Sequence, residues 1–399
     1  MTEIQPPITI AQSEMRTINR SAVLEYLRQH KTASRTELAR QLHFSKPTAM
    51  RIIDELLAGN LVRSAGQKSG GLGRTQELLT LNEDGNLVIG IDLGGSHISG
   101  GIANIGGEIL YKTKKDQSWG SAADNLERVV RFIQELQIEA GKHTGRLLGA
   151  ALGVPGIIDS RENLVRLAPA LDWRNFPLLE KLNARINLPV LVENDVNLAA
   201  MGEHWFGGGQ EVEDLVMVAI GTGIGAGVIL EGKLYRGFRE SSGEIGYLLP
   251  GLQFLDQKYP NFGAFETLAS GKGIAERGQQ AWSDTNGGKT APHLDAAAVF
   301  KAAREGQPWA GKVIKEAIDY LTLALANISV AYDPELIIIG GGVANAIADS
   351  LPAIQERLRG VIPFVPRIEV SKLLENACIL GAVARVFQKT ADYAVVQTI

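Results

Sequence analysis

Cysteine is nearly absent from this sequence. Cys378 is the one cysteine among 399 residues, so neither an intramolecular disulfide nor a zinc site built from several cysteines can form. Nowhere do 18 apolar residues follow one another, and residues 1–10 contain no basic segment followed by an apolar run. A membrane-spanning helix and a signal peptide would need these features. We therefore expect a cytoplasmic protein with no membrane partner.

The chain also lacks the compositional bias of disordered or fibrous proteins. Hydrophobic residues make up 45% and charged residues 21%, which is close to an average soluble protein. A length of 399 residues predicts two or three domains of about 100 to 200 residues each. Glycine is in excess at 45 residues, and it occurs in short clusters that are typical of tight loops.

Charge is unevenly distributed along the chain. Residues 1–80 contain 11 Lys and Arg and 7 Asp and Glu, a net charge of +4, whereas the other 319 residues contain 29 and 37, a net charge of −8. A basic first fifth on an acidic body favours a polyanionic partner for that part alone. An ordinary solvated surface is the alternative explanation.

The first eighty residues show the pattern of a helix-turn-helix. Ser34 is a good N-cap for a short helix, because Glu37 follows three residues later. A four-residue turn then leads to Pro47, which suits the first turn of the next helix, and Gly59 ends that helix. The three predicted helices cover 19–29, 35–42 and 47–58, and the first carries Ile18, Val23, Leu24 and Leu27 at helical spacing.

The third of these helices is the expected recognition helix. In a helix-turn-helix its N-terminal residues face base edges in the major groove, where Lys46 and Arg51 are the expected phosphate or guanine contacts. Short strands at 61–63 and 77–81 flank a glycine-rich basic segment, which predicts a wing. A helical protein-interaction module is the alternative. The expected contacts with a double-stranded DNA operator are Arg35, Ser45, Lys46, Thr48, Ala49 and Arg51 in the helices, with Lys68 and Arg74 in the wing.

Beyond residue 86, apolar strands alternate with helical stretches, which predicts the α/β class. Glycine loops follow three of the strands. Backbone N–H groups in such loops can close on a phosphate, and Asp92 is placed to hold Mg²⁺ through water. The complete P-loop motif, a glycine followed after four residues by Gly-Lys-Ser/Thr, is not present, which excludes the P-loop nucleotidases. The candidate nucleotide-binding residues are Asp92, Gly94, Gly95, Ser96, Gly221, Thr222, Gly223, Gly341 and Gly342.

Carboxylates at strand ends are the other candidate site residues. Asp195 follows an apolar strand and precedes a helix, where it could act as general base for a sugar hydroxyl, and Asn194 could pair with neighbouring hydroxyls. A helix N-cap is the alternative for this pair. Glu244 and Glu266 are further cleft candidates, although each taken alone is more typical of a surface acid.

Together, these segments resemble the ROK family (repressors, open reading frames and kinases), and within it the sugar-responsive repressors with an N-terminal winged helix. The resemblance covers nearly the whole chain, and the ordered combination is more specific than any one motif. It implies an actin-like sugar-kinase fold, a sugar between two lobes, Asp195 as the base in kinases, and dimers or tetramers. The motifs that carry it are 34–39, 59–62, 71–74, 92–96, 153–156, 193–195, 221–225 and 243–246.

Departures from the family pattern affect the implied sugar and metal sites. Tyr247 stands where members usually have histidine, and Ala170 stands where many have a sugar-binding asparagine. Residues 253–265 lack the family's three-cysteine run. We therefore expect an altered sugar preference and no zinc. The sugar-binding residues that the resemblance implies are Asn194, Asp195, Glu244, Tyr247 and Glu266.

The expected fold is α/β, with a winged helix-turn-helix over 1–82 followed by a two-lobed ROK fold. The small lobe covers 83–195, completed by 379–399, and the large lobe covers 196–378. We expect a repressor of carbohydrate-metabolism genes that is controlled by a sugar effector and requires no cofactor. The alternatives are a sugar kinase that uses Mg-ATP, with or without DNA binding, and a scaffold that binds neither ligand. The sequence does not specify the sugar, which could be a phosphorylated sugar or an amino sugar. It also does not specify whether the sugar releases the protein from DNA or promotes binding.

Overall fold

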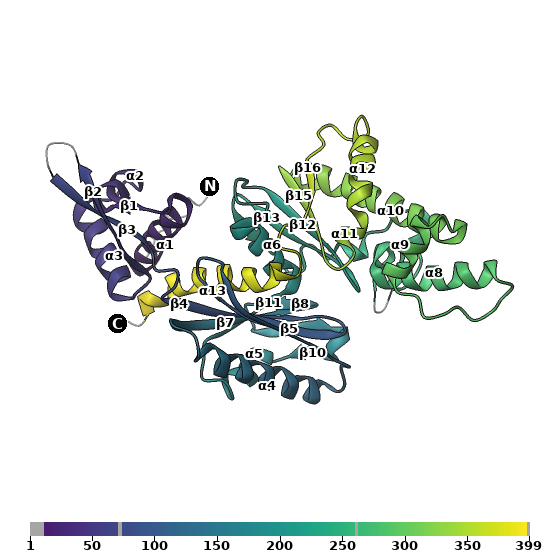
Figure 1. The fold of residues 1–399 in the computed structure, drawn as a ribbon, viewed down its shortest axis with the longest axis horizontal. Coiled ribbons are helices and arrows are strands. Elements are labelled where there is room, and N and C mark those ends of the chain that lie inside the picture. The colour runs from purple at the N-terminus through teal and green to yellow at the C-terminus, as the bar shows by residue number, and fades with distance from the viewer. Residues whose placement is uncertain (1–11, 71–73, 260–261, 397–399) are drawn as a thin grey trace, which may run out of the picture.

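The N-terminal domain is a winged helix (Figure 1). The computed structural model describes residues 12–70, 74–259 and 262–396. Ser34 and Ser45 cap the second and third helices, accepting hydrogen bonds from the backbone N–H of Glu37 at 3.2 Å and of Thr48 at 3.3 Å. Three strands form a sheet in the order β1-β3-β2. The elements are α1 Gln12–His30, β1 Ala33–Ser34, α2 Arg35–Gln41, α3 Lys46–Ala58, β2 Val62–Gly70 and β3 Arg74–Leu81.

The buried face of α1 differs from the sequence prediction at one position. Leu24 and Leu27 of α1 are buried, as expected, but Ile18 is 53% exposed. Ile18 precedes Leu27 by nine residues, and at about 100° per residue it lies on the opposite face of the helix. Ile18 therefore does not contribute to the buried face.

The small lobe is a five-stranded sheet in the order β11-β7-β4-β5-β6. β11, β7 and β4 are parallel neighbours, and β5 and β6 continue the sheet antiparallel. Helix α4 packs on one face and α13 on the other (Figure 1). The elements are β4 Asn86–Leu93, β5 His97–Asn104, β6 Ile109–Asp116, α4 Ala122–Ala140, β7 Arg146–Val154, β11 Val190–Asn194 and α13 Ala377–Val396, with a small sheet of β8 Ile157–Asp159, β9 Leu164–Ala168 and β10 Trp173–Phe176 beside α5 Leu178–Asn183.

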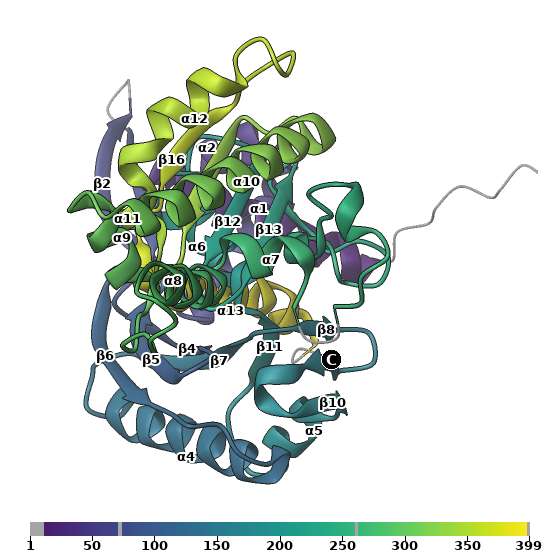
Figure 2. The ribbon, with the colours of Figure 1, turned by 90° about the vertical axis from the view of Figure 1, so that its right-hand side faces the viewer.

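The large lobe is built on a second five-stranded sheet, β14-β13-β12-β15-β16. Along β12, Val216 and Val218 join the core beneath the outer helices, whereas Leu215 and Met217 join a core with α6. Figure 2 shows the two lobes one above the other. The elements are α6 Asp195–Phe206, β12 Leu215–Ile220, β13 Ile224–Leu230, β14 Lys233–Tyr235, α7 Ala264–Ala269, α8 Gly271–Thr285, α9 Ala296–Arg304, α10 Pro308–Tyr332, β15 Leu336–Gly340, α11 Ala344–Ile347, α12 Leu351–Leu358 and β16 Arg367–Val370.

Helices α6 and α13 pack closely against each other between the lobes. A Cβ atom at Gly381 of α13 would overlap the carbonyl oxygen of Leu198, and one at Gly202 of α6 would overlap that of Ala377. Only glycine therefore permits this approach. α13 also packs against α1, so the core of the winged helix continues into the ROK-like part. Among the described residues, no helix is both long and apolar enough to cross a membrane.

Candidate functional site

Candidate residues of the small lobe gather at one edge of its sheet. Because β4, β7 and β11 are parallel, their carboxyl ends meet there. Asp92 lies near the end of β4, Asn194 ends β11, and Asp195 begins α6. A Cβ atom on Gly153 of β7 would lie 3.1 Å from the Cα of Asp195. The parallel topology thus brings together acids that are distant in sequence.

Asp92 and Asp195 influence each other's titration. Burial raises the pKa of Asp92 to about 7, and the charge of Asp195 adds to that shift, while a hydrogen bond from the Cys378 thiol opposes it. Burial also raises the pKa of Asp195 to about 6, against a 2.9 Å hydrogen bond from the backbone N–H of Val196. A carboxylate that titrates near neutral pH is well suited to accept a proton.

The large lobe contributes two further acids. Burial raises the pKa of Glu244 to about 7, and the charges of Asp195 and Glu266 add to the shift. Glu266 accepts hydrogen bonds from the backbone N–H of Ile224 at 3.0 Å and of Gly263 at 3.2 Å, yet burial still raises its pKa. No group of three or more His, Cys, Asp or Glu among the described residues is arranged to hold a metal ion. We call Asp92, Asp195, Glu244 and Glu266 the cleft carboxylates.

Asn194 and Tyr247 lie beside the cleft carboxylates. Asn194 caps α6 by accepting from the backbone N–H of Asn197 at 2.9 Å, and it donates to the carbonyl oxygen of Gly156 at 3.0 Å. It thus has the capping role that the sequence left as an alternative, and its amide can make further hydrogen bonds. Tyr247 is 42% exposed, and its pKa is raised by burial and then by the charges of Glu244 and Glu266. Ala170 lies exposed in the helical turn 169–171.

A small cavity between the lobes adjoins Asn194 and Glu244. Its volume is about 20 Å³, which is room for one water molecule. Next to it, Ser160 of the small lobe donates hydrogen bonds from its backbone N–H and its Oγ to Glu240 of the large lobe, at 2.8 and 2.6 Å. This pair joins the two lobes directly. The cavity is lined by Gly156, Asn194, Asn197, Gly225, Ala226, Glu240, Ser242, Gly243 and Glu244.

Glu193 is a site residue that sequence reasoning missed. Its side chain is 5% exposed and accepts hydrogen bonds from Arg236 at 3.1 and 2.5 Å and from Asn197 at 3.1 Å. Arg385 of α13 forms a further ion pair with it at 3.7 Å. Glu193 therefore ties the strand that carries Asn194 to the large lobe and to α13. An acid within an apolar strand indicates that a cation lies buried beside it. The sequence did not indicate which cation, because Arg236 and Arg385 are distant along the chain.

The predicted phosphate loops also lie around the cleft. A Cβ on Gly95 would be 3.2 Å from Oγ1 of Thr222, so these two loops face each other. The carbonyl oxygen of Gly221 accepts a hydrogen bond from the backbone N–H of Gly271 at 2.8 Å. Gly341 has a φ of +83°, which favours glycine. Open space lies beside the backbone at Gly221 and Gly342. The remaining predicted members of these loops are Gly94, Ser96 and Gly223.

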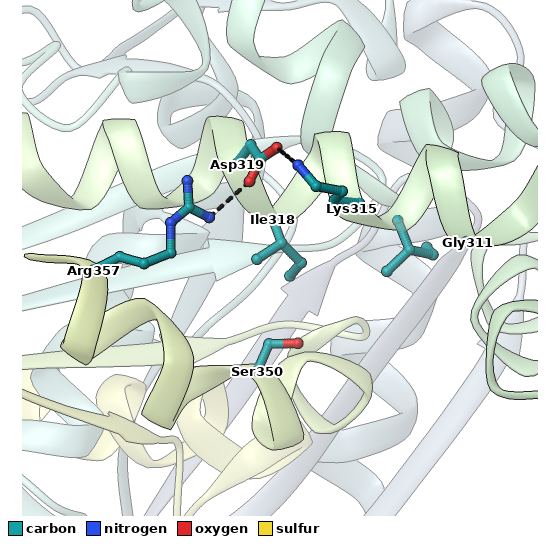
Figure 3. A pocket seen from close by; sticks show the side chains of 7 residues that line it. Gly311, Lys315, Ile318, Asp319, Ser350 and Arg357 are labelled. Atoms are coloured by element: carbon teal, nitrogen blue, oxygen red, sulfur yellow. Dashed lines mark hydrogen bonds and ion pairs between the residues drawn. The ribbon is translucent and has the colours of Figure 1, made fainter.

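A larger groove lies elsewhere, between α10 and α12 (Figure 3). Its volume is about 640 Å³, and none of the predicted site residues lines it. Lys315 and Arg357 both point to Asp319 and pair with it at 2.7 Å each. The cations of this groove are thus engaged within the groove itself, and we place the functional site at the cleft carboxylates.

The predicted recognition helix is α3. Lys46 and Arg51 are exposed on it and form no ion pair with another described residue. Ser45 and Thr48 bond to each other through their hydroxyls at 2.8 Å, at the start of the helix. Ala49 was predicted to face DNA, and this is wrong. It is 1% exposed in the core of the winged helix, because it lies three and four residues before the buried pair Ile52 and Ile53.

The other predicted DNA contacts differ in their surroundings. Arg35 pairs with Asp54 of α3 at 2.7 Å and with Glu77 of β3 at 3.8 Å, so its guanidinium braces the helix pair against the wing strand. Lys68 is exposed on β2. Arg74 begins β3 opposite Gly70, but its side chain lies outside the described residues, as do residues 71–73.

Comparison with known proteins decides the family. Residues 88–389 match the ROK family, and residues 17–71 match the MarR family. The chain belongs to the ROK family. The α/β fold of a winged helix followed by a ROK sugar-kinase domain is thereby confirmed.

Relatives of this ROK protein include regulators and kinases. The xylose repressor of Caldicellulosiruptor bescii is 31% identical, covering 95% of this chain and 98% of the relative. The crystal structure of a ROK family transcriptional regulator, described as a homolog of the E. coli MLC protein, has a TM-score of 0.82 at 26% identity and covers 96% and 98% of the two chains. A ROK glucokinase from Streptomyces griseus, solved with glucose and AMPPNP, has a TM-score of 0.66 at 29% identity and covers 76% and 99%. The regulators therefore align with nearly all of this chain, and the kinase with three quarters of it.

Proposed function

We propose that this ROK protein is a sugar-responsive transcriptional repressor of carbohydrate-metabolism genes. The observation that carries the proposal is the presence in one chain of a winged helix with exposed cations on α3 and a cluster of buried carboxylates from both lobes. Lys46 and Arg51 supply cations for DNA. Asp195 and Glu244 supply acceptors for sugar hydroxyls, and Asn194 supplies both a donor and an acceptor. A kinase alone has no use for the winged helix.

The charge of the cleft indicates the chemistry of its ligand. The cleft carboxylates lie together from both lobes, and burial together with mutual repulsion disfavours their ionised forms. A phosphate ester would add negative charge to this cluster, whereas the hydroxyls of an uncharged sugar would donate hydrogen bonds to it. We therefore propose an uncharged sugar as effector. D-xylose is the first probe, because a relative that aligns over nearly the whole chain is a xylose repressor.

Binding to a palindromic operator requires two winged helices, so we propose that the protein acts as a homodimer or a dimer of dimers. The two α3 helices would then enter major grooves about 34 to 36 Å apart, or a multiple of that. Operator binding and sugar binding can be tested separately. An operator is first selected from a random duplex pool with the wild-type chain, and its affinity is measured by fluorescence anisotropy.

In that assay, Lys46→Ala and Arg51→Ala are each expected to weaken operator binding by about tenfold and to reduce the salt dependence by about one unit of slope. Lys289→Ala, an exposed lysine of the large lobe, is the matched control and should leave affinity unchanged. Normal binding by both α3 variants would contradict the recognition-helix assignment. Thermal shift with D-xylose, D-glucose and N-acetyl-D-glucosamine tests the effector, and the absence of any shift or any effect on operator affinity would contradict sugar control.

A sugar kinase is the second candidate, favoured by the position and the pKa of Asp195. Mg-ATP would supply the phosphoryl group, and the open space beside the backbone at Gly221 and Gly342 fits a phosphate chain. Asp195 would take the proton of the sugar hydroxyl. ADP release with D-glucose or D-xylose, abolished in Asp195→Asn, would support this activity, and the absence of ADP release would exclude it for those sugars.

A further inference from the structure

We infer that the contact between Arg28 and Trp205 couples the sugar cleft to the DNA-binding domain. Arg28 lies on α1 of the winged helix, and Trp205 lies near the end of α6, the helix that begins at Asp195 in the cleft. The inference rests on the proposed function, because it concerns how sugar binding changes operator affinity. It assigns that coupling to one side-chain contact outside both binding sites.

The contact combines a stacked cation with a hydrogen bond. The guanidinium carbon of Arg28 lies 4.7 Å from the centroid of the Trp205 ring, and Nη1 donates to the carbonyl oxygen of Trp205 at 3.3 Å. Glu25 orients the guanidinium by accepting from Nε at 2.9 Å and from Nη2 at 2.6 Å. The indole also contacts the ring of Phe387 of α13 in an edge-on arrangement, with 5.9 Å between the ring centroids. Trp205 is 8% exposed, so its ring is held on several sides.

α6 is built as a rigid connection between this contact and the cleft. Asp195 and Trp205 are ten residues apart on one helix, which corresponds to about 15 Å along its axis. The glycine contacts at Gly202 and Gly381 leave no space between α6 and α13. Two residues before Trp205, Glu203 is fully buried and accepts hydrogen bonds from the backbone N–H of Gly208 at 2.9 Å and of Leu373 at 3.1 Å. A displacement of Asp195 by a ligand is therefore expected to move Trp205 rather than bend the helix.

On the other side, α1 is joined firmly to the recognition helix. Arg16 donates hydrogen bonds to Glu55 of α3 at 3.1 and 2.5 Å, and Arg20 pairs with the same carboxylate at 3.6 Å. Glu55 lies in the last turn of α3. A rotation of α1 at Arg28 thus carries α3 with it. Because two α3 helices must match the spacing of two half-sites, a small rotation changes operator affinity.

The remaining contacts between α1 and the ROK domain are of another kind. Val23 and Leu24 of α1 share an apolar cluster with Val383 and Phe387 of α13. Apolar contacts have no preferred direction and tolerate small sliding movements. The fork of a guanidinium has a fixed geometry, both toward an aromatic face and toward a carbonyl oxygen. For this reason we assign the coupling to Arg28 and Trp205 and the docking to the apolar cluster.

The test compares operator affinity with and without sugar in full-length variants. Arg28→Met keeps the apolar stem of the side chain and removes the guanidinium, and Trp205→Leu removes the ring. Gln29→Ala is the matched control on the same helix, because Gln29 is exposed and also bonds to Glu25, at 2.8 Å. The probe is an equimolar mixture of D-xylose, D-glucose and N-acetyl-D-glucosamine, with the selected operator. Sugar affinity is measured separately without DNA.

We expect both variants to bind the sugar mixture within twofold of wild type and to lose at least four fifths of the sugar-induced change in operator affinity. Arg28→Lys, which keeps the charge without the planar fork, should retain part of the response, and Gln29→Ala all of it. A wild-type response in Arg28→Met would overturn the coupling role alone. A parallel loss of sugar affinity in both variants would also overturn it, because the contact would then support only the fold. An unresponsive wild type would refute the proposed function and the coupling together.

Discussion

The raised pKa of Asp92 predicts that Asp92→Asn, which has the same shape but no charge, gains stability relative to wild type as the pH rises, when no ligand is bound. The folded-state pKa is about 7, against 3.8 for the unfolded chain. The native state therefore binds this proton more tightly, so the stabilisation is fully present below about pH 4 and is lost as the pH rises through 7. Between pH 5 and pH 8, linkage gives a loss of about 2.6 kcal/mol. This is an upper value, because Asp92 and Asp195 titrate as a coupled pair.

Asp92→Asn escapes that loss, because its side-chain amide does not titrate in this pH range. With an unfolding entropy of about 2.1 cal/mol/K per residue over roughly 300 residues, 2.6 kcal/mol corresponds to about 4 °C. The melting temperature of Asp92→Asn relative to wild type should therefore rise by up to about 4 °C between pH 5 and pH 8, as measured by calorimetry without ligand.

Asp159→Asn is the control for the sign of this effect. Hydrogen bonds from the backbone N–H of Glu162 and from the side chain of Arg166 lower the pKa of Asp159. Its ionised form thus stabilises the fold above about pH 4, and that contribution is constant between pH 5 and pH 8. The control should be less stable than wild type by a similar amount at both pH values. If the difference between Asp92→Asn and wild type is the same at both pH values, or falls with pH, the argument from burial is refuted.

Two further predictions concern packing between the lobes, and urea unfolding measures both. Gly381→Ala should destabilise the protein by about 1–3 kcal/mol, because the new methyl group meets the carbonyl oxygen of Leu198, whereas Gly311→Ala, with open space around it in α10, should be stabilising by about 0.5–1 kcal/mol; equal effects would contradict close packing of α6 on α13. Glu193→Gln should cost about 3 kcal/mol, because it removes the carboxylate that faces Arg236 and Arg385, and an effect below 0.5 kcal/mol would show that the ion pairs contribute little.

Features that depend on neighbouring residues in the chain were predictable from the sequence. Ser34, Pro47 and Gly59 mark helix ends through local hydrogen bonding and backbone preference. In the structure Ser34 and Gly59 are helix caps, and the third helix begins at Lys46, one residue before Pro47. The positions of Asp92 and Asp195 after apolar strands also followed from the sequence, whereas the parallel pairing that brings them together came from the structure. The order of motifs along the chain then indicated the family.

Features that depend on distant parts of the chain were not predictable. The partners of Glu193 lie in a large-lobe loop and in α13, and Arg28 meets Trp205 across a domain boundary. No local pattern specifies such pairs. Ala49 shows a different failure, since a small apolar residue on a recognition helix suits either a base edge or the core, and only the packed domain shows that it points inward.

The position of α13 has a consequence for synthesis of the protein. Residues 377–396 leave the ribosome after every other described element, yet the helix covers one face of the small-lobe sheet and supports α1. A nascent chain can complete its winged helix from the first 81 residues, because the sheet and helices of that domain are local. The small lobe, in contrast, keeps an apolar face of its sheet bare until α13 has emerged. During that interval the exposed face depends on protection from aggregation, and the winged helix is complete before the domain that we propose controls it.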